Sequence, residues 1–512
     1  QMYSASVSTY PDSSSSRIFL QNLKRKTDPG RPGRYSLATL NKSDIESREP
    51  TFTGRQTIIR LDGGVQQIKL DKSNEATGLN GNTNNNTFGI VKEYSVNPET
   101  NEWKKVLLPW TVRSFSNDNE FVKFNKESDK YSQRYRIREN GNNSKRDLGD
   151  IVNSPIVAVG GYLATSANDG MVHIFKKGNG GDDRNYSLKL SYIPGTMPRK
   201  DIESKDSNLA KELRTFAEKS YVGDRYGVDG GFVLRKVDNL NGQNRVFMFG
   251  AMGFGGRGAY ALDLTKADGS DPTKASLFDV KDNSNNGNNR VELGYTVGTP
   301  QIGKTHDGKY AAFLASGYAT KEITSTDNKT ALYVYDLESS GTLIKKIDVP
   351  GGKGGLSSPT LVDKDLDGIV DIAYAGDRGG KMYRFDLSNQ DSSQWTVRTI
   401  FEGTKPITSA PAISQLKDKR VVIFGTGSDL SEEDVDNNDI QSIYGIFDND
   451  TDTGFAQDGL GKGLLEQKLE KDKDGKTLFL SDYKRSDGSG DKGWVVKLEA
   501  GQRVTVKPTV VL

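Results

Sequence analysis

A repeated strand unit constrains this chain more than any other feature of its sequence. Each unit opens with a small residue and a proline, then reaches a glycine-rich turn and a closing strand. The openings are Ser154–Pro155, Thr299–Pro300, Ser358–Pro359 and Ala410–Pro411. The predicted closing strands are Val172–Phe175, Ala259–Leu264, Leu332–Leu337, Met382–Leu387 and Ile443–Asp448. Four of them carry an acid near the end, at Asp263, Asp336, Asp386 and Asp448, so the spacings are 73, 50 and 62 residues. Repeats of this size built from strands are typical of propeller blades.

We therefore predict an all-β chain folded as a modified β-propeller. A four-stranded sheet cannot bury both faces alone, whereas radially packed blades bury each other's faces and protect their edges. Five blades are readable. Two more are expected, from Arg55–Leu70 with Glu102–Val112 and from Trp494–Leu498 with Pro508–Leu512, which makes seven. The alternative fold is a β-sandwich or several small β domains.

The rest of the chain is expected to hold loop insertions, one short helix and an arm. Polar insertions are predicted at Asn80–Thr87, Asp282–Arg290 and Ser428–Asp439. Asp201–Ser220 carries apolar residues at helical spacing and predicts the helix. Residues 1–50 are expected to form an N-terminal arm or remnant, and residues 51–512 the propeller domain. Because the chain starts at Gln1 and stops in a strand-like run, we expect it to be part of a larger protein, with any targeting signal outside it.

Composition narrows the chemistry. There are no cysteines, which excludes disulfides, thiolate metal sites and cysteine nucleophiles. Only two histidines are present, so a histidine-rich metal centre is excluded. The net charge of +2 gives no global attraction to nucleic acid, and we expect none to bind. No run of about 18 apolar residues exists, so the sequence predicts no membrane-spanning helix.

The sharpest local motif is a calcium-binding loop at Asp363–Asp371. Asp363, Asp365 and Asp367 alternate, Gly368 permits a tight turn, and Asp371 closes the shell at the ninth position. Ile369, at the seventh, offers a backbone carbonyl. Calcium prefers six to eight hard oxygen ligands, and this spacing supplies them. The sequence therefore predicts one Ca²⁺ site with ligands Asp363, Asp365, Asp367, Ile369 and Asp371.

This loop differs from the helix–loop–helix calcium site. Its twelfth position is Tyr374 rather than Glu, and Ile372–Gly376 alternates like a strand. We expect a nine-residue loop between strands, in which Asp371 does the closing. The alternative without a metal is a polar hairpin tip with Asx turns. Asp448, Asp450 and Asp452 also alternate, but the ninth position of that run is Ala456. We expect that run to be a solvated loop.

Three other motifs resemble catalytic or cofactor sites. Gly253–Gly258 spells a dinucleotide fingerprint, but the next residues read as a strand where that site needs a helix. We predict a hairpin turn there. His173 shares a strand face with Met171 and Phe175 and is expected to be packed and hydrogen-bonded. His306 lies in a His-Asp-Gly-Lys turn and is expected to be exposed.

From about Leu148 to Val506 the chain resembles the C-terminal domain of the PilC/PilY pilus-tip proteins. The matching segments keep their order and are Leu148–Ser154, Ala167–His173, Gly253–Gly258 with Ala261–Leu264, Leu293–Thr296, Gly355–Leu387, Gly425–Gly427 with Ser442–Ile446, and Gly493–Trp494. The resemblance implies a modified, seven-bladed propeller at the bacterial surface, outer membrane or pilus tip. It implies roles in pilus biogenesis, in countering retraction, in twitching motility and in adherence, with pilins and a host-cell receptor as partners. It also implies calcium control through a loop like Asp363–Asp371.

The leading functional hypothesis is a binding module, not an enzyme, whose activity depends on its calcium state. One alternative is a purely structural calcium site, with adhesion carried elsewhere in the full-length protein. Another is a quinone-dependent dehydrogenase, since such enzymes share the propeller architecture and use calcium. The two histidines and four tryptophans give no converging polar groups for that cofactor.

Overall fold

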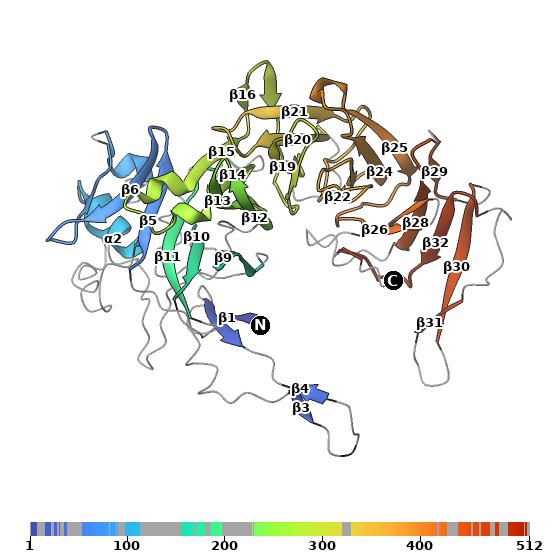
Figure 1. Ribbon diagram of the computed structural model, residues 1–512, viewed down its shortest axis with the longest axis horizontal. Helices are drawn as coiled ribbons and strands as arrows, with labels where there is room; N and C mark the ends of the chain where they lie inside the picture. Colours follow the sequence, from blue (N-terminus) through green and yellow to red (C-terminus); the bar gives the residue numbers. More distant parts are fainter. Residues whose placement is uncertain are drawn as a thin grey trace. The chain divides into compact units, whose positions relative to one another are not determined.

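The structure is a computed structural model of the chain (Figure 1). It describes residues 2–7, 16–21, 25–27, 30, 35–37, 54–80, 82–88, 90, 98–112, 155–167, 170–179, 185–196, 228, 230–319, 329–416, 419–427, 439–451, 454–459, 462–471, 477–480, 490–505 and 507–508. The chain divides into two compact units. The first comprises Gln1–Asp229, Leu234–Met248 and Tyr260–Asp279, and the second Gly230–Val233, Phe249–Ala259 and Val280–Leu512.

The described residues are mainly strands. Two short hairpins precede the first large sheet, β1 (Met2–Val7) with β2 (Ser16–Gln21) and β3 (Arg25–Thr27) with β4 (Tyr35–Leu37). The predicted helix at 201–220 and most of the acidic insertion at 428–439 lie outside the described residues.

The first large sheet has seven strands in the order β7-β6-β5-β11-β10-β9-β8. Its strands are β5 (Gln56–Leu61), β6 (Gly64–Leu70), β7 (Ala76–Thr77), β8 (Val157–Val159), β9 (Tyr162–Ser166), β10 (Val172–Lys177) and β11 (Tyr186–Ile193). Since β5 pairs in parallel with β11, the strands of 55–70 extend this sheet. The prediction that they begin a separate blade is wrong.

Residues 102–112 are helical, which corrects the prediction of strands there. A π-helix, η2 (Trp103–Leu107), continues into α2 (Leu108–Thr111). Val106, Leu107 and Trp110 are buried in a core with Ile59 of β5. Trp110 follows Val106 and Leu107 by four and three residues, which places the three on one helical face. This periodicity outweighs the strand preference of the β-branched residues Val106, Thr111 and Val112.

The second sheet is a four-stranded meander with the order β12-β13-β14-β15. Its strands are β12 (Phe232–Leu240), β13 (Gln243–Ala251), β14 (Gly258–Asp263) and β15 (Ser276–Lys281). Gly253–Gly258 connects two strands of this sheet, as predicted, and not a strand to a helix. Short elements also occur in the described residues: η1 (Asn85–Phe88), η4 (Leu264–Lys266), η5 (Pro272–Ala275), and the hairpin of β16 (Ser284–Asn286) with β17 (Asn289–Val291).

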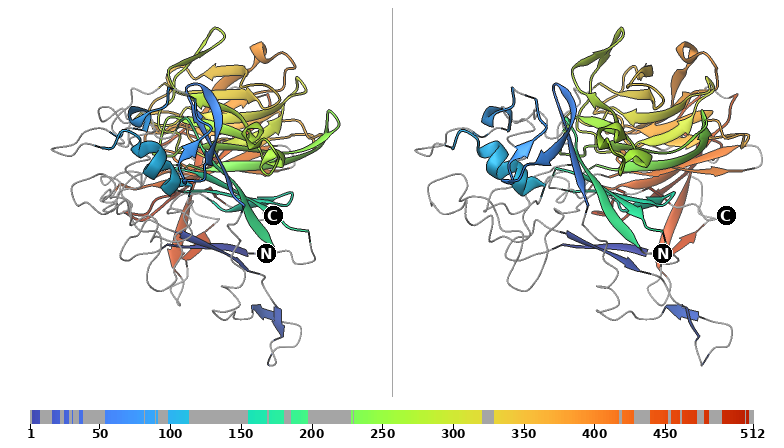
Figure 2. Two further views of the ribbon diagram at one scale, coloured as in Figure 1. Left: turned by 90° about the vertical axis from the view of Figure 1, so that its left-hand side faces the viewer. Right: turned by 60° about the vertical axis from the view of Figure 1, so that its left-hand side comes forward.

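Three further sheets belong to the second unit and follow one another in sequence order, from olive through orange to red in Figure 1. The first holds β18 (Gln301–Lys304), β19 (Tyr310–Ala315), β20 (Ala331–Asp336) and β21 (Leu343–Asp348). The next holds β22 (Thr360–Val362), β23 (Ile372–Gly376), β24 (Lys381–Asp386), β25 (Thr396–Glu402) and β29 (Ala456–Gln457), with η6 (Ser392–Gln394) between β24 and β25. The last holds β26 (Ala412–Gln415), β27 (Arg420–Gly425), β28 (Ser442–Asp448), β32 (Gly493–Lys497), β30 (Leu464–Lys471) and β31 (Thr477–Leu480). Figure 2 shows these layers from two other directions.

The proline-marked openings and the closing strands are confirmed as strands. Pro300, Pro359 and Pro411 stand immediately before β18, β22 and β26. The predicted closing strands are β10, β14, β20, β24 and β28. The last four are each the third strand of their sheets, whereas β10 lies between β11 and β9 in the seven-stranded sheet. The fourth strands were missed because sequences such as β21 and β25 are half-exposed and carry lysine, arginine or threonine among their apolar residues.

Both faces of the middle sheet of this unit are buried, which is what the packing of blades requires. Ala373 and Ala375 of β23 lie in a core with residues of β19 and β20. Ile372 and Tyr374 lie in a second core with residues of β27 and β28. Because strand side chains alternate between faces, β23 contributes to both cores at once. The trailing segment Trp494–Leu498 was predicted to begin another blade, but β32 pairs with β28 and belongs to this last sheet.

Candidate metal centre

The predicted calcium loop is the hairpin connection between β22 and β23. Val362 pairs with Ile372, so Asp363–Asp371 closes the end of this antiparallel pair. The loop brings together the four predicted carboxylates, Asp363, Asp365, Asp367 and Asp371, with one oxygen from each within 4.8 Å of the others. Among the described residues, this is the one group of acids and histidines gathered closely enough to hold a metal ion.

Hydrogen bonds within the loop hold its curled shape. The carboxylate of Asp363 accepts the N–H groups of Gly368 at 2.7 Å and Asp367 at 3.2 Å. Asp367 accepts the N–H of Ile369 at 2.9 Å. Gly368 has φ of 84°, a conformation that favours glycine. Leu366 also has positive φ, 55°, and is 89% exposed, so the loop tip places an apolar side chain in solvent.

The electrostatics differ along the loop. Desolvation opposes ionisation of Asp363, but the hydrogen bonds from Gly368 and Asp367 outweigh it and lower the pKa of that carboxyl. Desolvation and the negative charges of Asp367 and Asp371 raise the pKa of Asp365. Backbone N–H donors thus favour the ionised form of Asp363, whereas the neighbouring carboxylates disfavour the ionised form of Asp365. A cation among them would remove this repulsion.

Asp371 is the most buried of the four acids, with 5% of the residue exposed. Its Oδ2 accepts the N–H of Lys364 at 2.7 Å, and its Oδ1 lies 2.8 Å from Nε2 of His306. The loop is also tied to the preceding sheet, because the N–H of Val370 donates to the carbonyl of Lys304 at 2.8 Å. Asp371 is therefore positioned from two sides by bonds within the chain.

The donor set fits a hard cation. All four side chains offer carboxylate oxygens, and oxygen is the ligand that calcium and magnesium prefer. Ile369, at the seventh position, forms the isolated bridge with Lys304. Its role as a ligand stays a prediction.

The predictions for the two histidines have different outcomes. His173 is fully buried and its Nδ1 lies 2.8 Å from the hydroxyl of Ser191, so the prediction of a packed, hydrogen-bonded residue is confirmed. His306 was expected to be exposed, yet its side chain is only 20% exposed and contacts Asp371. Sequence reasoning missed it because the two residues lie 65 positions apart on different sheets.

A second charged cluster lies between the last two sheets. Buried Asp448 is 3.0 Å from Nε of Arg384, 2.9 Å from Nη2 of Arg398 and 3.7 Å from Nη1 of Arg420, and it also accepts the hydroxyl of Tyr374. The expectation of a solvated acidic loop is wrong for Asp448. Its carboxylate is held by arginines, which leaves no reason for a cation there.

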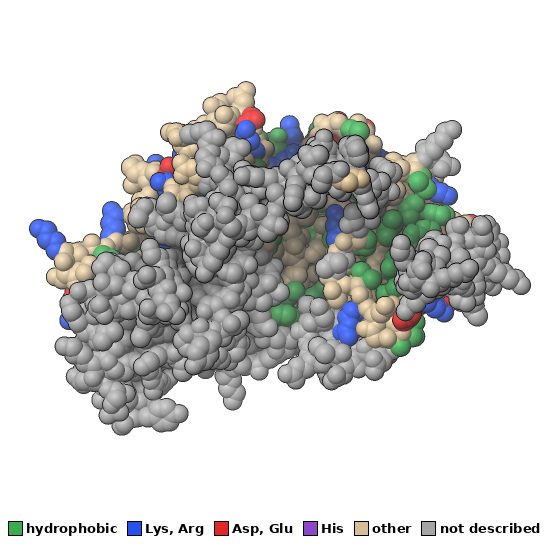
Figure 3. All heavy atoms as spheres, turned by 90° about the horizontal axis from the view of Figure 1, so that it is seen from below, with side chains coloured by type: hydrophobic (Ala, Val, Ile, Leu, Met, Phe, Trp, Pro, Cys, Tyr) green, Lys and Arg blue, Asp and Glu red, His purple; other side chains and the backbone are tan. Residues whose placement is uncertain are grey.

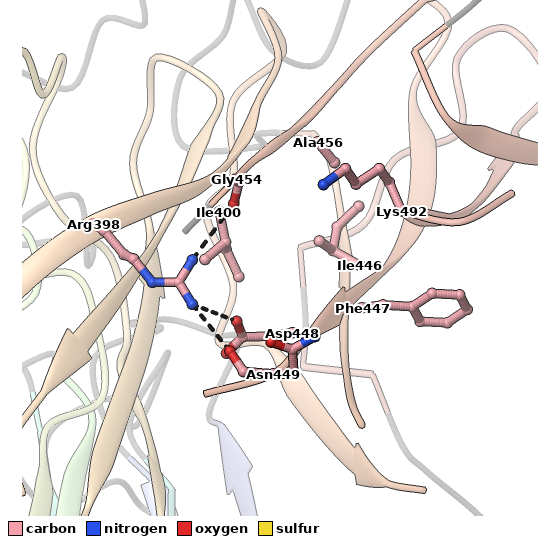
Figure 4. A pocket seen from close by; sticks show the side chains of 9 residues that line it. All are labelled: Arg398, Ile400, Ile446, Phe447, Asp448, Asn449, Gly454, Ala456 and Lys492. Atoms are coloured by element: carbon pink, nitrogen blue, oxygen red, sulfur yellow. Dashed lines mark hydrogen bonds and ion pairs between the residues drawn. The ribbon is translucent and has the colours of Figure 1, made fainter. Parts of the chain in front are cut away.

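A small pocket adjoins this cluster (Figure 4). Arg398 extends over it and donates to the carboxylate of Asp448 and to the carbonyls of Asn449 and Gly454. The pocket is lined by Arg398, Ile400, Ile446, Phe447, Asp448, Asn449, Gly454, Ala456 and Lys492. These bonds fasten the segment after β28 to β25.

The loop Asp363–Asp371, here called the metal loop, contacts this cluster through the side chain of Lys364. Nζ of Lys364 lies 2.9 Å from Asp450, whose other oxygen lies 2.6 Å from Nη2 of Arg384. The loop therefore contacts the sheet before it through Lys304 and His306 and the sheet after it through Lys364.

Figure 3 shows how charge is distributed over the described residues of one face. On the face in Figure 3, lysine and arginine side chains of the described residues are dispersed rather than gathered. Within the described part of the chain, no helix is both long and apolar enough to cross a membrane.

Comparison with known proteins identifies relatives. The family model of the PilY1 beta-propeller domain matches residues 148–484, more than half of the chain. The type IV pilus biogenesis factor PilY1 of Pseudomonas aeruginosa strain PAK is 28% identical over 403 residues, covering 65% of this chain and 32% of that protein. A PilY1 homolog of Xylella fastidiosa is 30% identical over 307 residues, covering 58% and 21%.

A solved structure is also similar. The crystal structure of the Pseudomonas aeruginosa PilY1 C-terminal domain aligns with a TM-score of 0.47 and 23% identity, covering 68% of this chain and 73% of that one. The chain spans about a third of the length of the Pseudomonas relatives it matches. On the extent of the family-model match, this chain belongs to the PilY1 β-propeller family.

Proposed function

We propose that the loop Asp363–Asp371 binds one Ca²⁺ ion and that the chain acts in type IV pilus biogenesis in a calcium-dependent way. The observation that carries the proposal is the convergence of four carboxylates within 4.8 Å in a loop whose own backbone donors fix its shape. Asp363, Asp365, Asp367 and Asp371 would hold the ion, with the carbonyl of Ile369 as a fifth ligand. The ion would supply positive charge among the four carboxylates, because the ammonium of Lys364 is paired with Asp450 outside the loop.

The pilus role rests on the relatives, which are named type IV pilus biogenesis factors. We propose that this chain acts at the cell surface or pilus tip, where it contacts pilins and a host-cell receptor. Its calcium state would then set the balance of pilus assembly against retraction, and with it twitching motility and adherence.

We further propose that the chain is a binding module rather than an enzyme. Both histidines, the residues best suited to acid–base chemistry at neutral pH, are held in structural contacts with Ser191 and Asp371. This observation favours a role in binding over the quinone-dependent dehydrogenase alternative.

Calorimetric titration with Ca²⁺ tests the metal site. The unaltered chain should bind one ion, and at a free Ca²⁺ concentration of about 100 Kd the bound state gains about 2.7 kcal/mol. For a unit of 150–250 residues this gain corresponds to a rise in Tm of about 5–10 °C. Asp363→Ala and Asp371→Ala should abolish binding while the fold survives. Asp348→Ala, on a strand of the preceding sheet, removes an exposed acid and is the matched control. Undiminished binding by either loop variant would overturn the assignment.

The cellular role needs a separate assay. A strain lacking the full-length protein should be complemented by the gene carrying Asp371→Ala, with piliation, twitching and adherence scored separately. Calcium control predicts that at least one of the three changes while the protein stays at normal abundance. If all three are unaltered, the ion only stabilises the fold.

A further inference from the structure

The acid that closes the metal loop is held from outside the loop. In the described residues, Asp363 and Asp367 accept N–H groups of the loop itself, from Gly368, Asp367 and Ile369. Asp371 differs, because one of its oxygens is bonded to a side chain of the preceding sheet, His306. Since a carboxylate only accepts, the Nε2 in this contact must carry the proton and donate it.

The turn that carries His306 is braced by its own bonds. It joins β18 to β19, and the N–H of Thr305 donates to the carbonyl of Lys309 at 2.9 Å. The N–H of Gly308 donates to the carbonyl of Thr305 at 2.9 Å, and Gly308 has φ of 83°. The hydroxyl of Thr305 bonds to Asp307. His306 is thus presented by a turn whose shape does not depend on the metal loop.

The backbone fixes the distance between this turn and the loop. Lys304, two residues before His306, forms a parallel bridge with Ile369 and accepts the N–H of Val370 at 2.8 Å. This bridge lies two residues before Asp371. The imidazole and the carboxylate therefore meet because two backbone segments are already joined beside them.

We propose that His306 is a positioning residue of the metal site, which makes metal affinity depend on the contact between two neighbouring sheets. The inference rests on the proposed function. With Oδ1 bonded to His306 and Oδ2 bonded to the N–H of Lys364, Asp371 has one fixed rotamer, and each oxygen keeps a lone pair for an ion. Hydrogen bonds of this kind orient metal ligands, and their loss costs about 10–100-fold in affinity.

The coupling is reciprocal. If the contact with His306 raises affinity for the ion, the bound ion must stabilise that contact by the same factor. Calcium should therefore slow hydrogen exchange at Val370 in the loop and at Thr305 and Gly308 in the turn. A site confined to its own loop would protect Val370 and leave the turn unchanged.

The test uses Ca²⁺ calorimetry on the full chain. The variants are His306→Ala and His306→Gln, with Lys309→Ala in the same turn as the matched control. We expect His306→Ala to bind Ca²⁺ about 10–100-fold more weakly than the unaltered chain. His306→Gln keeps an N–H donor, so its affinity should recover to within about threefold of the unaltered chain. Lys309→Ala should leave the affinity unchanged. Equal affinity of His306→Ala and the unaltered chain, or no recovery with Gln, would overturn the positioning role.

Hydrogen exchange on the unaltered chain keeps the inference testable should the variants not fold. Slower exchange at Thr305 and Gly308 with calcium supports it, and exchange unaffected by calcium in the turn contradicts it. If the unaltered chain binds no Ca²⁺ at all, the proposed function itself fails.

Discussion

Replacing Asp448 by Asn should destabilise the second unit strongly, because it removes the charge that a cluster of arginines surrounds. Only 3% of the Asp448 side chain is exposed, and Arg384, Arg398 and Arg420 surround it. Removal of one partner from a buried ion pair costs about 3–5 kcal/mol, because the remaining charge is left without compensation. Asp450 still neutralises Arg384 and Arg420, and Arg398 is 23% exposed, so the lower end of that range applies.

We therefore expect a loss of about 3 kcal/mol and a fall in Tm of about 6–12 °C for a unit of this size. Chemical denaturation followed by tyrosine and tryptophan fluorescence measures the free energy, and calorimetry measures Tm. The matched control is Asp450→Asn, whose acid is 42% exposed and should matter by less than about 1 kcal/mol. If Asp448→Asn costs no more than this control, the arginine cluster does not depend on its buried carboxylate and the reasoning is refuted.

Two further predictions concern the same sheets. Desolvation raises the pKa of Asp450, but the hydrogen bond from Lys364 and the charges of Arg420 and Arg384 outweigh it and lower that pKa. Because the folded pKa lies below the unfolded one, the stabilisation by Asp450 is complete above about pH 4 and is lost at lower pH. The unaltered chain should therefore lose more stability than Asp450→Asn between about pH 5 and 2, and parallel curves of stability against pH would contradict this. Gly445→Ala places a Cβ 2.2 Å from the indole of Trp494 and should cost about 1–3 kcal/mol in denaturant titrations, whereas an unaltered midpoint would show that the indole moves aside freely.

The strand units and the four loop carboxylates could be predicted because their signals are local. Prolines shortly before β8, β18, β22 and β26 identify four openings, and apolar runs identify the five predicted closing strands. The spacing within Asp363–Asp371 identifies the acids, because a curled nine-residue hairpin brings alternate side chains together.

The missed features depend on register between distant segments. Nothing near His306 in the sequence indicates Asp371, since their contact follows from the bridge between β18 and the metal loop. Asp448 looked like part of a solvated loop because its arginine partners come from β24, β25 and β27. The helix at 103–111 was mistaken for strands because a short apolar run carries both periodicities. The predicted count of seven blades is not confirmed, because the strands expected to start the two extra blades pair with neighbouring sheets. The division into an arm and one propeller domain stays a prediction.

The way the metal loop joins β23 limits how its length can change. Asp371 is followed at once by Ile372, with no spacer between the last acid and a strand buried on both sides. Inserting or deleting one residue between the acids and β23 would move every side chain of this strand to the opposite face of the sheet. Tyr374 would then face the core that now holds Ala373 and Ala375. The larger tyrosine side chain would overfill that core, and an alanine in its former place would leave a void in the other core. Homologous loops are therefore expected to vary in composition but to keep nine residues, because a change in length would disrupt both neighbouring cores.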